Sequence, residues 1–271
     1  MDYHKEAAEI IAVLADSCSE AQLIGSMSIS TYDTAWVSMV SKPDGAELRW
    51  LFPESFQIVL DSQSLDGGWD GPGSETDTIL NSLAALLALC RHHTAPAHTN
   101  GNNPPDLLSR ISKAVVGFEI ISPSIINSLR SFGICLYEPP VLLSLQAQKL
   151  RGFDWNLLYG SRQLALLHSL EAFDGLIDFD RLSHHMRNGS FLGSPSSTAA
   201  YLMNSSVWSI EAEQYLHTVF QKGTGQSSGK FPSAFPSANF ELSWVGTMIY
   251  RKRRLLIETI YRLFPHFSVL D

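Results

Sequence analysis

Apolar residues recur at helical spacing along almost the whole chain of 271 residues. Side chains at every third or fourth position form one stripe that a helix can bury. No segment alternates convincingly between apolar and polar residues, as a half-buried strand would. The spacing therefore predicts an all-α protein with roughly ten to twelve helices of modest length. The expected helices cover residues 4–15, 29–40, 53–63, 79–90, 107–115, 123–132, 139–150, 155–173, 178–187, 194–204 and 210–222, and a last one begins near residue 239.

Several of these segments begin with residues that favour helix starts. Ser30 with Asp33, and Ser74 with Asp77, have the spacing of a capping box, in which the two side chains satisfy free backbone amides. Pro53 stands at a first helical position, where its missing N–H costs nothing. These local signals support the helical assignment.

Composition limits the class of protein. The net charge is −8 and 45% of residues are hydrophobic, which fits a soluble globular chain and argues against a protein that wraps nucleic acid. The three cysteines lie far apart in apolar stretches, without metal-ligand spacing, which favours a reducing compartment. We find no signal peptide and no apolar run long enough to span a bilayer, so we expect a cytoplasmic protein.

Two loops share one plan. Residues 65–86 and 186–203 each pass from a polar residue and glycine to an aromatic residue, then to a turn with Ser or Thr that starts a helix of small residues. Glycine allows the left-handed exit from a helix, and the hydroxyl caps the next one. We interpret both as hinges of a helix-hairpin repeat. Asp66, Asp70, Glu75 and Asp77 are then caps and turn residues, although a role in binding a metal or phosphate stays open.

Seven motifs in register resemble the N-terminal half of class II diterpene cyclases, most closely those of fungal copalyl diphosphate synthases and bifunctional ent-kaurene synthases. The resemblance runs from about Ser28 to Val245. The motifs are residues 32–36 (YDTAW), 52–53 (FP), 65–69 (LDGGW), 117–124 (GFEI with PS), 167–171 (LHSLE), 188–200 (NGSF with SPSSTAA) and 231–244 (FP to FELSW).

The resemblance implies an α/α-barrel. It assigns residues 1–45 to N-terminal helices that include the first helix of the family's β domain, residues 46–245 to its γ domain, and residues 246–271 to a divergent basic tail, so the β domain would be incomplete. In the family, geranylgeranyl diphosphate enters a groove between these domains and becomes a copalyl diphosphate, a precursor of gibberellin-type diterpenoids. The family uses Mg²⁺, but no residue here supports a metal or cofactor site: relatives carry proposed acidic ligands near 104–116, where this chain departs from them.

Protonating an alkene requires an unusually strong acid, which the family supplies from a DxDD motif. The chain contains no DxDD; the nearest string is Asp178-Phe179-Asp180. No two carboxylates are adjacent, which also excludes a DDxxD metal motif. We therefore expect a chain that is inactive alone, with the missing β and α cyclase domains as possible partners. The alternative is an all-α module that binds a prenyl chain or serves as a scaffold for a complete cyclase.

One catalytic residue of the family is matched. The resemblance implies that His168, in the LHSLE string, helps to hold the water that removes the final proton, together with a partner asparagine. The alternative is a buried histidine bonded to a backbone carbonyl, because His168 lies among leucines.

Other candidates favour structural roles. Neighbouring residues on a helix point about 100° apart, so His92-His93 and His184-His185 make poor zinc pairs. Residues 223–230 lack the spacing and preceding strand of a phosphate loop. The basic run 251–254 is expected to be a solvated helix face, although it could also meet diphosphate or an acidic membrane. We expect one or two of five tryptophans to line a cavity and the rest to be core: Trp36, Trp69, Trp155, Trp208 and Trp244.

Overall fold

The computed structural model describes residues 27–45, 47–71, 75–93, 118–222 and 229–238, and six single positions near the ends (Glu9, Ala12, Phe240, Glu241, Ser243 and Trp244). The chain divides into a compact unit over Ser28–Ser233 and a second unit made of Met1–Met27 and Ala234–Asp271. The expected helices at 4–15, 107–115 and beyond 239 lie wholly or mainly outside the described residues. The predicted boundaries at residues 45 and 245 stay predictions.

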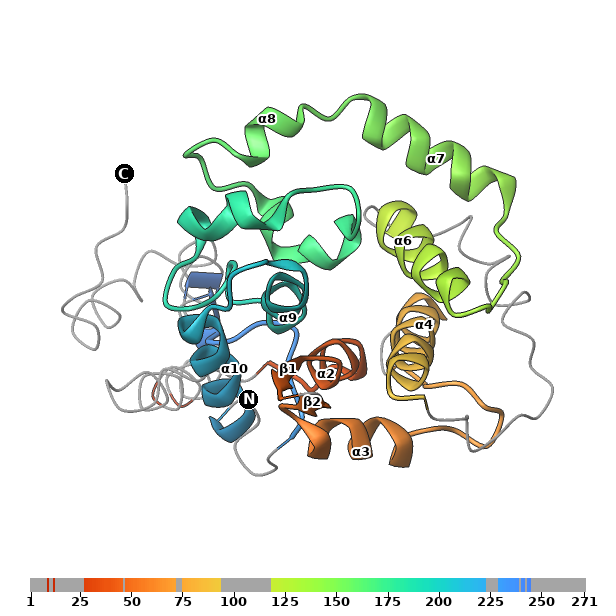
Figure 1. Cartoon of the computed structure of the whole chain (residues 1–271), viewed down its shortest axis with the longest axis horizontal. Helices are drawn as coiled ribbons and strands as arrows, with labels where there is room; N and C mark the ends of the chain where they lie inside the picture. The colour runs from red at the N-terminus through yellow and green to blue at the C-terminus, as the bar shows by residue number, and fades with distance from the viewer. Residues whose placement is uncertain are drawn as a thin grey trace. The chain divides into compact units, whose positions relative to one another are not determined.

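The compact unit is mostly helical, which confirms the predicted class (Figure 1). Four regular α-helices form its first half: α2 (Thr31–Ser38), α3 (Pro53–Asp61), α4 (Glu75–Arg91) and α6 (Phe118–Ser131). The second half contains α7 (Pro140–Arg151), α8 (Trp155–Leu158), two 3₁₀ helices named η2 (Ala165–Phe173) and η3 (Phe179–His185), α9 (Pro195–Asn204) and α10 (Ile210–Lys222).

Neighbouring elements close a ring. Helix α2 packs on α4, α4 on α6, α6 on η2, η2 on α9, and α9 again on α2. Helices α3, α7 and α10 pack on α2, α6 and α9 respectively, outside that ring. Segments more than a hundred residues apart in sequence are therefore brought together where α2, η2 and α9 meet.

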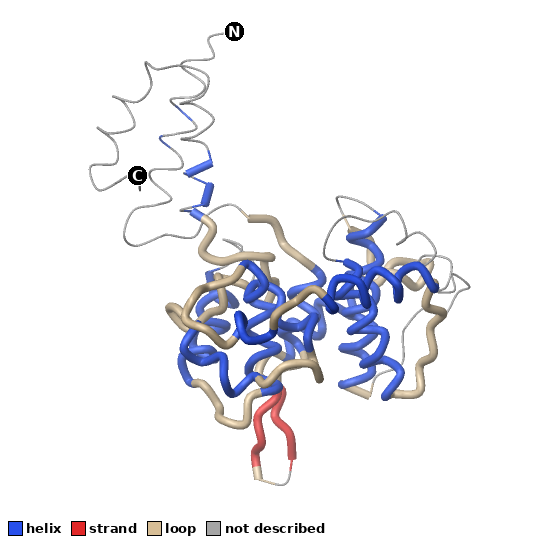
Figure 2. Tube along the Cα trace, turned by 90° about the horizontal axis from the view of Figure 1, so that it is seen from above, coloured by secondary structure: helices blue, strands red, loops and turns tan. Residues whose placement is uncertain are grey.

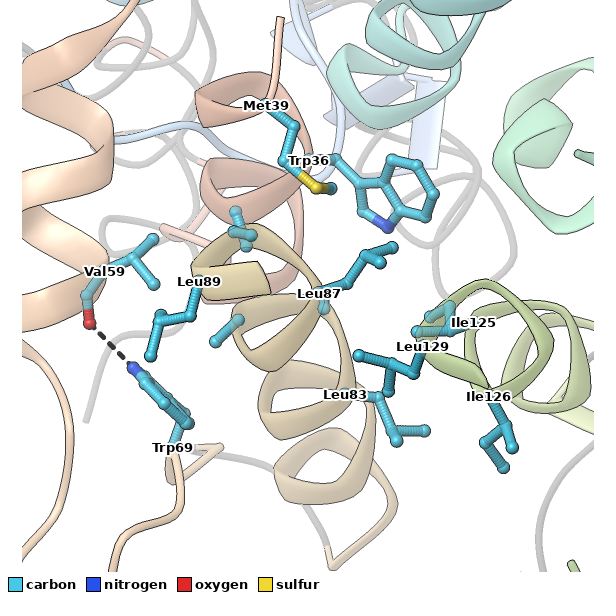
Figure 3. Packing of buried hydrophobic residues seen from close by; sticks show 14 of the residues in the cluster. Trp36, Met39, Val59, Trp69, Leu83, Leu87, Leu89, Ile125, Ile126 and Leu129 are labelled. Atoms are coloured by element: carbon cyan, nitrogen blue, oxygen red, sulfur yellow. Dashed lines mark hydrogen bonds between the residues drawn. The ribbon is translucent and has the colours of Figure 1, made fainter. Parts of the chain in front are cut away.

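The main core lies on the α2–α4–α6 side of the ring. Along α4, Leu83 faces the apolar side chains of α6, Leu87 faces Trp36 of α2, and Leu89 lies beside Val59 of α3 and Trp69; most of this cluster is fully buried (Figure 3). Burying aliphatic side chains of this size stabilises a fold by about 1.5–3 kcal/mol each. The 17-residue helix α4 thus holds the two neighbouring helices together.

The helix caps follow the sequence signals. Ser30 Oγ accepts a hydrogen bond from Asp33 N at 3.1 Å, as expected of an N-cap. Pro53 occupies the first turn of α3. Ser74 lies outside the described residues. The reciprocal half of the predicted capping box does not form, because Ser30 N donates to Phe231 O at 2.8 Å and Asp33 Oδ1 accepts from Ser196 N.

The hairpin was not predicted. Strands β1 (Ser41–Asp44) and β2 (Glu47–Trp50) pair antiparallel and project from the compact unit (Figure 2). Most of its side chains are exposed, so no alternating apolar pattern marks it. Gly45, with φ of +65°, begins the two-residue turn between Asp44 and Glu47.

Three helix predictions were wrong in detail. The expected helix at 155–173 divides into α8 and η2, because the chain leaves helical geometry after Leu158 and is extended at Leu164. Residues 179–185 form a 3₁₀ helix rather than a regular one. Helix α6 starts at Phe118, so Pro123 lies inside it instead of opening it. Among the described helices, none has the length and hydropathy needed to cross a membrane.

Candidate functional site

His168 lies in η2, between the buried residues Leu167 and Leu170, and is itself half-buried. The backbone of the next residue, Ser169, leaves helical geometry, with φ of −140° and ψ of 46°. Among the described residues, none forms a hydrogen bond with the His168 imidazole. Burial raises the pKa of Asp33 in α2, and the electrostatic interaction with His168 opposes part of this rise.

A polar cluster lies where α2, η2 and α9 meet. We define the buried polar cluster as Tyr32 and Asp33 of α2, Glu171 of η2 and Ser196 of α9. Tyr32 Oη donates to Glu171 Oε1 at 3.1 Å, and Ser196 Oγ donates to the same oxygen at 3.3 Å. Ser196 N donates to Asp33 Oδ1 at 3.3 Å. Three elements that are distant in sequence are thus joined by the two acids.

Burial changes the acidity of the cluster. Glu171 is 2% exposed and Asp33 3% exposed. Loss of water, with a smaller contribution from the nearby charge of Asp33, raises the pKa of Glu171 from 4.5 to about 8, although the hydrogen bonds of Glu171 oppose this rise. Burial also raises the pKa of Asp33, although the hydroxyls of Ser30 and Ser196 oppose this. Glu171 therefore holds its proton at neutral pH.

Burial outweighs the hydrogen bonds in setting the protonation of Glu171. Oε1 accepts both hydrogen bonds of the cluster, while the buried Oε2 has no hydrogen-bond partner among the described residues. Removing water favours the neutral form of a carboxyl group. Such a group is a weak acid, which is the opposite of what protonation of an alkene requires. The buried polar cluster therefore suits a structural role better than that of a proton donor.

Ser197 connects α9 to the backbone on both sides of His168. Its Oγ donates to Leu167 O at 2.7 Å and accepts from Leu170 N at 3.2 Å. The side chain is fully buried. Neither Ser197 nor Glu171 was predicted from the sequence to have a role at this site. The one signal for Glu171 is that it is an acid within an otherwise apolar run.

The first glycine-rich loop is built as a turn. Asp66 Oδ1 accepts from Gly68 N at 3.1 Å, and Asp70 Oδ2 accepts from Ser64 Oγ at 2.8 Å. Trp69 is buried, and its Nε1 donates to Val59 O at 2.7 Å (Figure 3). These contacts give Asp66 and Asp70 the structural roles predicted for turn residues.

The other two acids of that loop are only partly described. Glu75 opens α4, but its side chain lies outside the description, and Asp77 is half-buried near the start of the same helix. In the described parts of the chain, no three residues of the types His, Cys, Asp and Glu gather in a group suited to a metal ion.

The second loop, residues 186–203, has the same kind of amide-to-hydroxyl hydrogen bonds as the first. Phe191 N donates to Thr198 Oγ1 at 3.3 Å, much as Gly71 N donates to Thr78 Oγ1 at 3.1 Å in the first loop. Ser194 caps α9 by accepting from Ser197 N at 3.2 Å. Both loops therefore satisfy their amides with hydroxyls of the helix that follows.

Three histidines of the two pairs, His92, His184 and His185, bond to backbone carbonyls. His92 Nε2 contacts Ser38 O at 2.9 Å, and its ring is stacked between Trp50 and Phe56 at centroid distances of 3.7 and 3.6 Å. His184 and His185 contact Gly160 O and Leu158 O at 2.9 and 2.8 Å. Burial lowers the pKa of both His92 and His185.

The five tryptophans have different environments. Trp36 and Trp69 belong to the main core, and Trp155 meets Phe173 edge-on at 5.8 Å. Trp208 Nε1 donates to Glu213 Oε2 at 2.6 Å, beneath Lys42. Trp244 is largely exposed. The expectation that one or two line a cavity stays a prediction.

Several sequence candidates fall outside the described residues. These are residues 223–228, the segment 104–116 and the basic run 251–254. Gly229 is described and has φ of +97°; a Cβ there would lie 2.8 Å from Ile58 Cδ1. The chain therefore approaches α3 closely at this glycine.

Comparison with known proteins identifies the relatives of the chain. No protein-family model matches it. It is 44% identical over 260 residues to phyllocladan-16-alpha-ol synthase of Phomopsis amygdali, covering 88% of this chain and 26% of that protein. It is 41% identical over 263 residues to copalyl diphosphate synthase of Talaromyces verruculosus, covering 90% and 27%. The chain is a relative of the fungal diterpene cyclases. It spans about a quarter of the length of these relatives.

Solved structures agree with this relationship. The ent-copalyl diphosphate synthase of Arabidopsis thaliana, in complex with (S)-15-aza-14,15-dihydrogeranylgeranyl thiolodiphosphate, matches with a TM-score of 0.70 and 27% identity, over 96% of this chain and 37% of that one. Abietadiene synthase of Abies grandis matches with a TM-score of 0.73 and 23% identity, over 99% and 37%, which supports the fold alone. The predicted resemblance and the α/α-barrel fold that it implied are confirmed.

Proposed function

We propose that this chain is one part of a class II diterpene cyclase, whose complete form converts geranylgeranyl diphosphate into a copalyl diphosphate. The observation that carries the proposal is the 41% identity to a copalyl diphosphate synthase over 90% of the chain. A structural relative bound to an analogue of the proposed substrate supports it. The pathway would be that of gibberellin-type or other labdane-related diterpenoids.

In this function His168 would take part in the final deprotonation, as the residue that holds the basic water. Its imidazole is half-buried and forms no hydrogen bond with the described residues, so it has capacity to hold a water molecule. A water bound in this way can take the proton that ends the cyclisation. The role would require a partner group to complete the site.

The residues that the structure describes do not provide the acid that protonates the alkene. The two buried acids near the His168 segment, Asp33 and Glu171, have raised pKa values and are therefore weaker acids than usual. The sequence contains no DxDD motif. We therefore propose that the chain needs another cyclase segment, the β and α domains implied by the resemblance, for activity.

Mg²⁺ is proposed as the ion that accompanies the substrate's diphosphate, as the resemblance implies. A divalent cation would neutralise the diphosphate charge when bound. The described residues do not form a ligand group for it, so no magnesium ligand is proposed among them. The chain's own contribution is to shape the site and to place His168.

The test is a complementation experiment. The purified chain, incubated with geranylgeranyl diphosphate and Mg²⁺, is expected to give no product by mass spectrometry, whereas mixing it with the remaining part of a fungal cyclase should give copalyl diphosphate. His168→Ala should lower that yield about 100-fold or more, and His93→Ala should not. Product from the chain alone would contradict its dependence on other segments.

A mixture that binds substrate but never turns over would instead favour the alternative of a binding or scaffold module. The two outcomes are separable because a scaffold would raise the stability or yield of a complete cyclase without requiring His168. The same His168→Ala variant therefore discriminates between the two functions.

A further inference from the structure

The 3₁₀ helix that contains His168, η2, is interrupted at the next residue. Ser169 has φ of −140° and ψ of 46°, so η2 consists of two short turns that meet at this residue. A 3₁₀ helix normally holds itself by bonds from each amide to the carbonyl three residues earlier. At a break those bonds are lost, and the orientation of the neighbouring side chains must be maintained by another element.

Ser197 of α9 holds both sides of this break. Its Oγ donates to Leu167 O at 2.7 Å and accepts from Leu170 N at 3.2 Å. Leu167 and Leu170 enclose the two residues His168 and Ser169. One hydroxyl thus bridges the two sides of the break.

The position of this hydroxyl is itself constrained. Ser197 is fully buried, and its backbone N donates to the cap residue Ser194 at 3.2 Å. The next residue of η2 after Leu170 is Glu171, which Tyr32 and Ser196 hold from α2 and α9. The described contacts of the His168 segment therefore come largely from other elements of the ring.

We infer that Ser197 is a positioning residue for His168: its hydroxyl bridges the backbone break at Ser169 and thereby sets where the imidazole points. The inference rests on the proposed role of His168 in the final deprotonation. Ser197 acts through the backbone and touches neither substrate nor the reacting atoms. Small displacements of a catalytic group have large effects on rate, so loss of this bridge is expected to slow the reaction.

The first test measures geometry without activity. The chain contains nine histidines, so ring ¹³C labelling gives a spectrum in which His168 can be assigned from its loss in His168→Ala. Ser197→Ala should shift or broaden the His168 ring signal, and should speed hydrogen exchange of the Leu170 amide about tenfold, because that amide loses its acceptor. Ser197→Thr keeps the hydroxyl and should restore both.

The matched control is Thr198→Val. Thr198 is a buried neighbour on α9 whose hydroxyl also makes two hydrogen bonds, to Ser194 O at 2.7 Å and from Phe191 N at 3.3 Å, but none to η2. It should leave the His168 signal in place. If Ser197→Ala does not fold, Ser197→Cys replaces it, with a smaller shift in the same direction. An unchanged His168 signal in Ser197→Ala, or an equal shift in Thr198→Val, would overturn the inference.

The second test uses the complemented enzyme. Ser197→Ala should lower kcat about 10- to 100-fold with little change in the KM for geranylgeranyl diphosphate, because substrate binding does not involve Ser197. An unchanged kcat would also count against the inference. If the complemented wild type is inactive, the proposed function fails, but the spectroscopic result still decides whether Ser197 positions His168.

Discussion

Glu171 is a carboxyl group removed from water and held by two hydroxyls. Tyr32 Oη and Ser196 Oγ both donate to its Oε1, and these bonds favour the anion, but burial favours the neutral acid more strongly. The pKa of about 8 means that folding favours the protonated form. An acid of this kind adds a pH dependence to stability rather than a proton to a substrate.

The first prediction concerns this pH dependence. The folded pKa of Glu171 is raised from 4.5 to about 8, so its favourable contribution is complete below pH 4.5 and is lost as the pH rises to about 8. Through that window the free energy of unfolding should fall by up to about 1.4 kcal/mol per pH unit. Glu171→Gln, which stays neutral and keeps an acceptor for both hydroxyls, should flatten the curve.

Urea unfolding at several pH values measures the effect. Asp33, with its pKa also raised, contributes in the same direction and remains in the variant. The exposed Glu47 of β2 provides the control, since Glu47→Gln should give a curve parallel to that of the wild type. Parallel curves for Glu171→Gln and the wild type would show that Glu171 is not neutral in the folded chain.

At the scale of the element, the two glycine-rich loops connect helices by close backbone approach. Gly189 has φ of +76°, and a Cβ at this position would overlap Glu211 O of α10 and lie 3.0 Å from Tyr215 Cβ. Gly175, which follows η2, has nearly the same φ of +74°, but a Cβ added there would meet no atom within 4 Å. Comparing substitutions at Gly189 and Gly175 therefore separates the cost of backbone strain from the cost of steric overlap.

Substituting these glycines should therefore give different losses. Gly175→Ala should cost about 1 kcal/mol for the left-handed backbone alone. Gly189→Ala adds a collision with backbone that cannot rotate away, and should cost about 3 kcal/mol or more. Thermal unfolding of both variants measures the difference, and equal losses would mean that the approach of α10 to this loop is looser than the structure shows.

At the scale of the whole molecule, the described compact unit depends on the core that joins α2, α4 and α6. Leu87 of α4 is completely buried in it, and its neighbours belong to more than one helix (Figure 3). Leu143 of α7 is 42% exposed and serves as the matched leucine outside that core. Their comparison measures how much stability comes from packing between helices.

Leu87→Ala should lower the free energy of unfolding by about 2–5 kcal/mol, through lost burial and the cavity left behind. Leu143→Ala should change it by about 0.5 kcal/mol or less, as is usual for surface positions. Denaturant unfolding with both tryptophan fluorescence and circular dichroism tests this, since Trp36 and Trp69 lie in the same core. Similar losses from both variants would place the main core elsewhere.

Much of the fold could be predicted because its signals are local. Ser30 and Pro53 mark the starts of α2 and α3, and the loop residues Asp66 and Asp70 bond to groups only two and six positions away. Such contacts depend on residues that are close in sequence. The exposed hairpin at 41–50 was missed because its strands bury little and carry no apolar alternation.

The sequence by itself determined the helical class, the caps, the glycine hinges and the resemblance that drew attention to His168, because each depends on residues that are neighbours in the chain. Only the tertiary structure decided which groups surround that histidine. Tyr32 and Glu171 are 139 positions apart, and Ser197 reaches Leu167 across 30. Whether an acid keeps its proton, and which side chain bridges a broken 3₁₀ helix, depends on burial and on partners that only packing brings together.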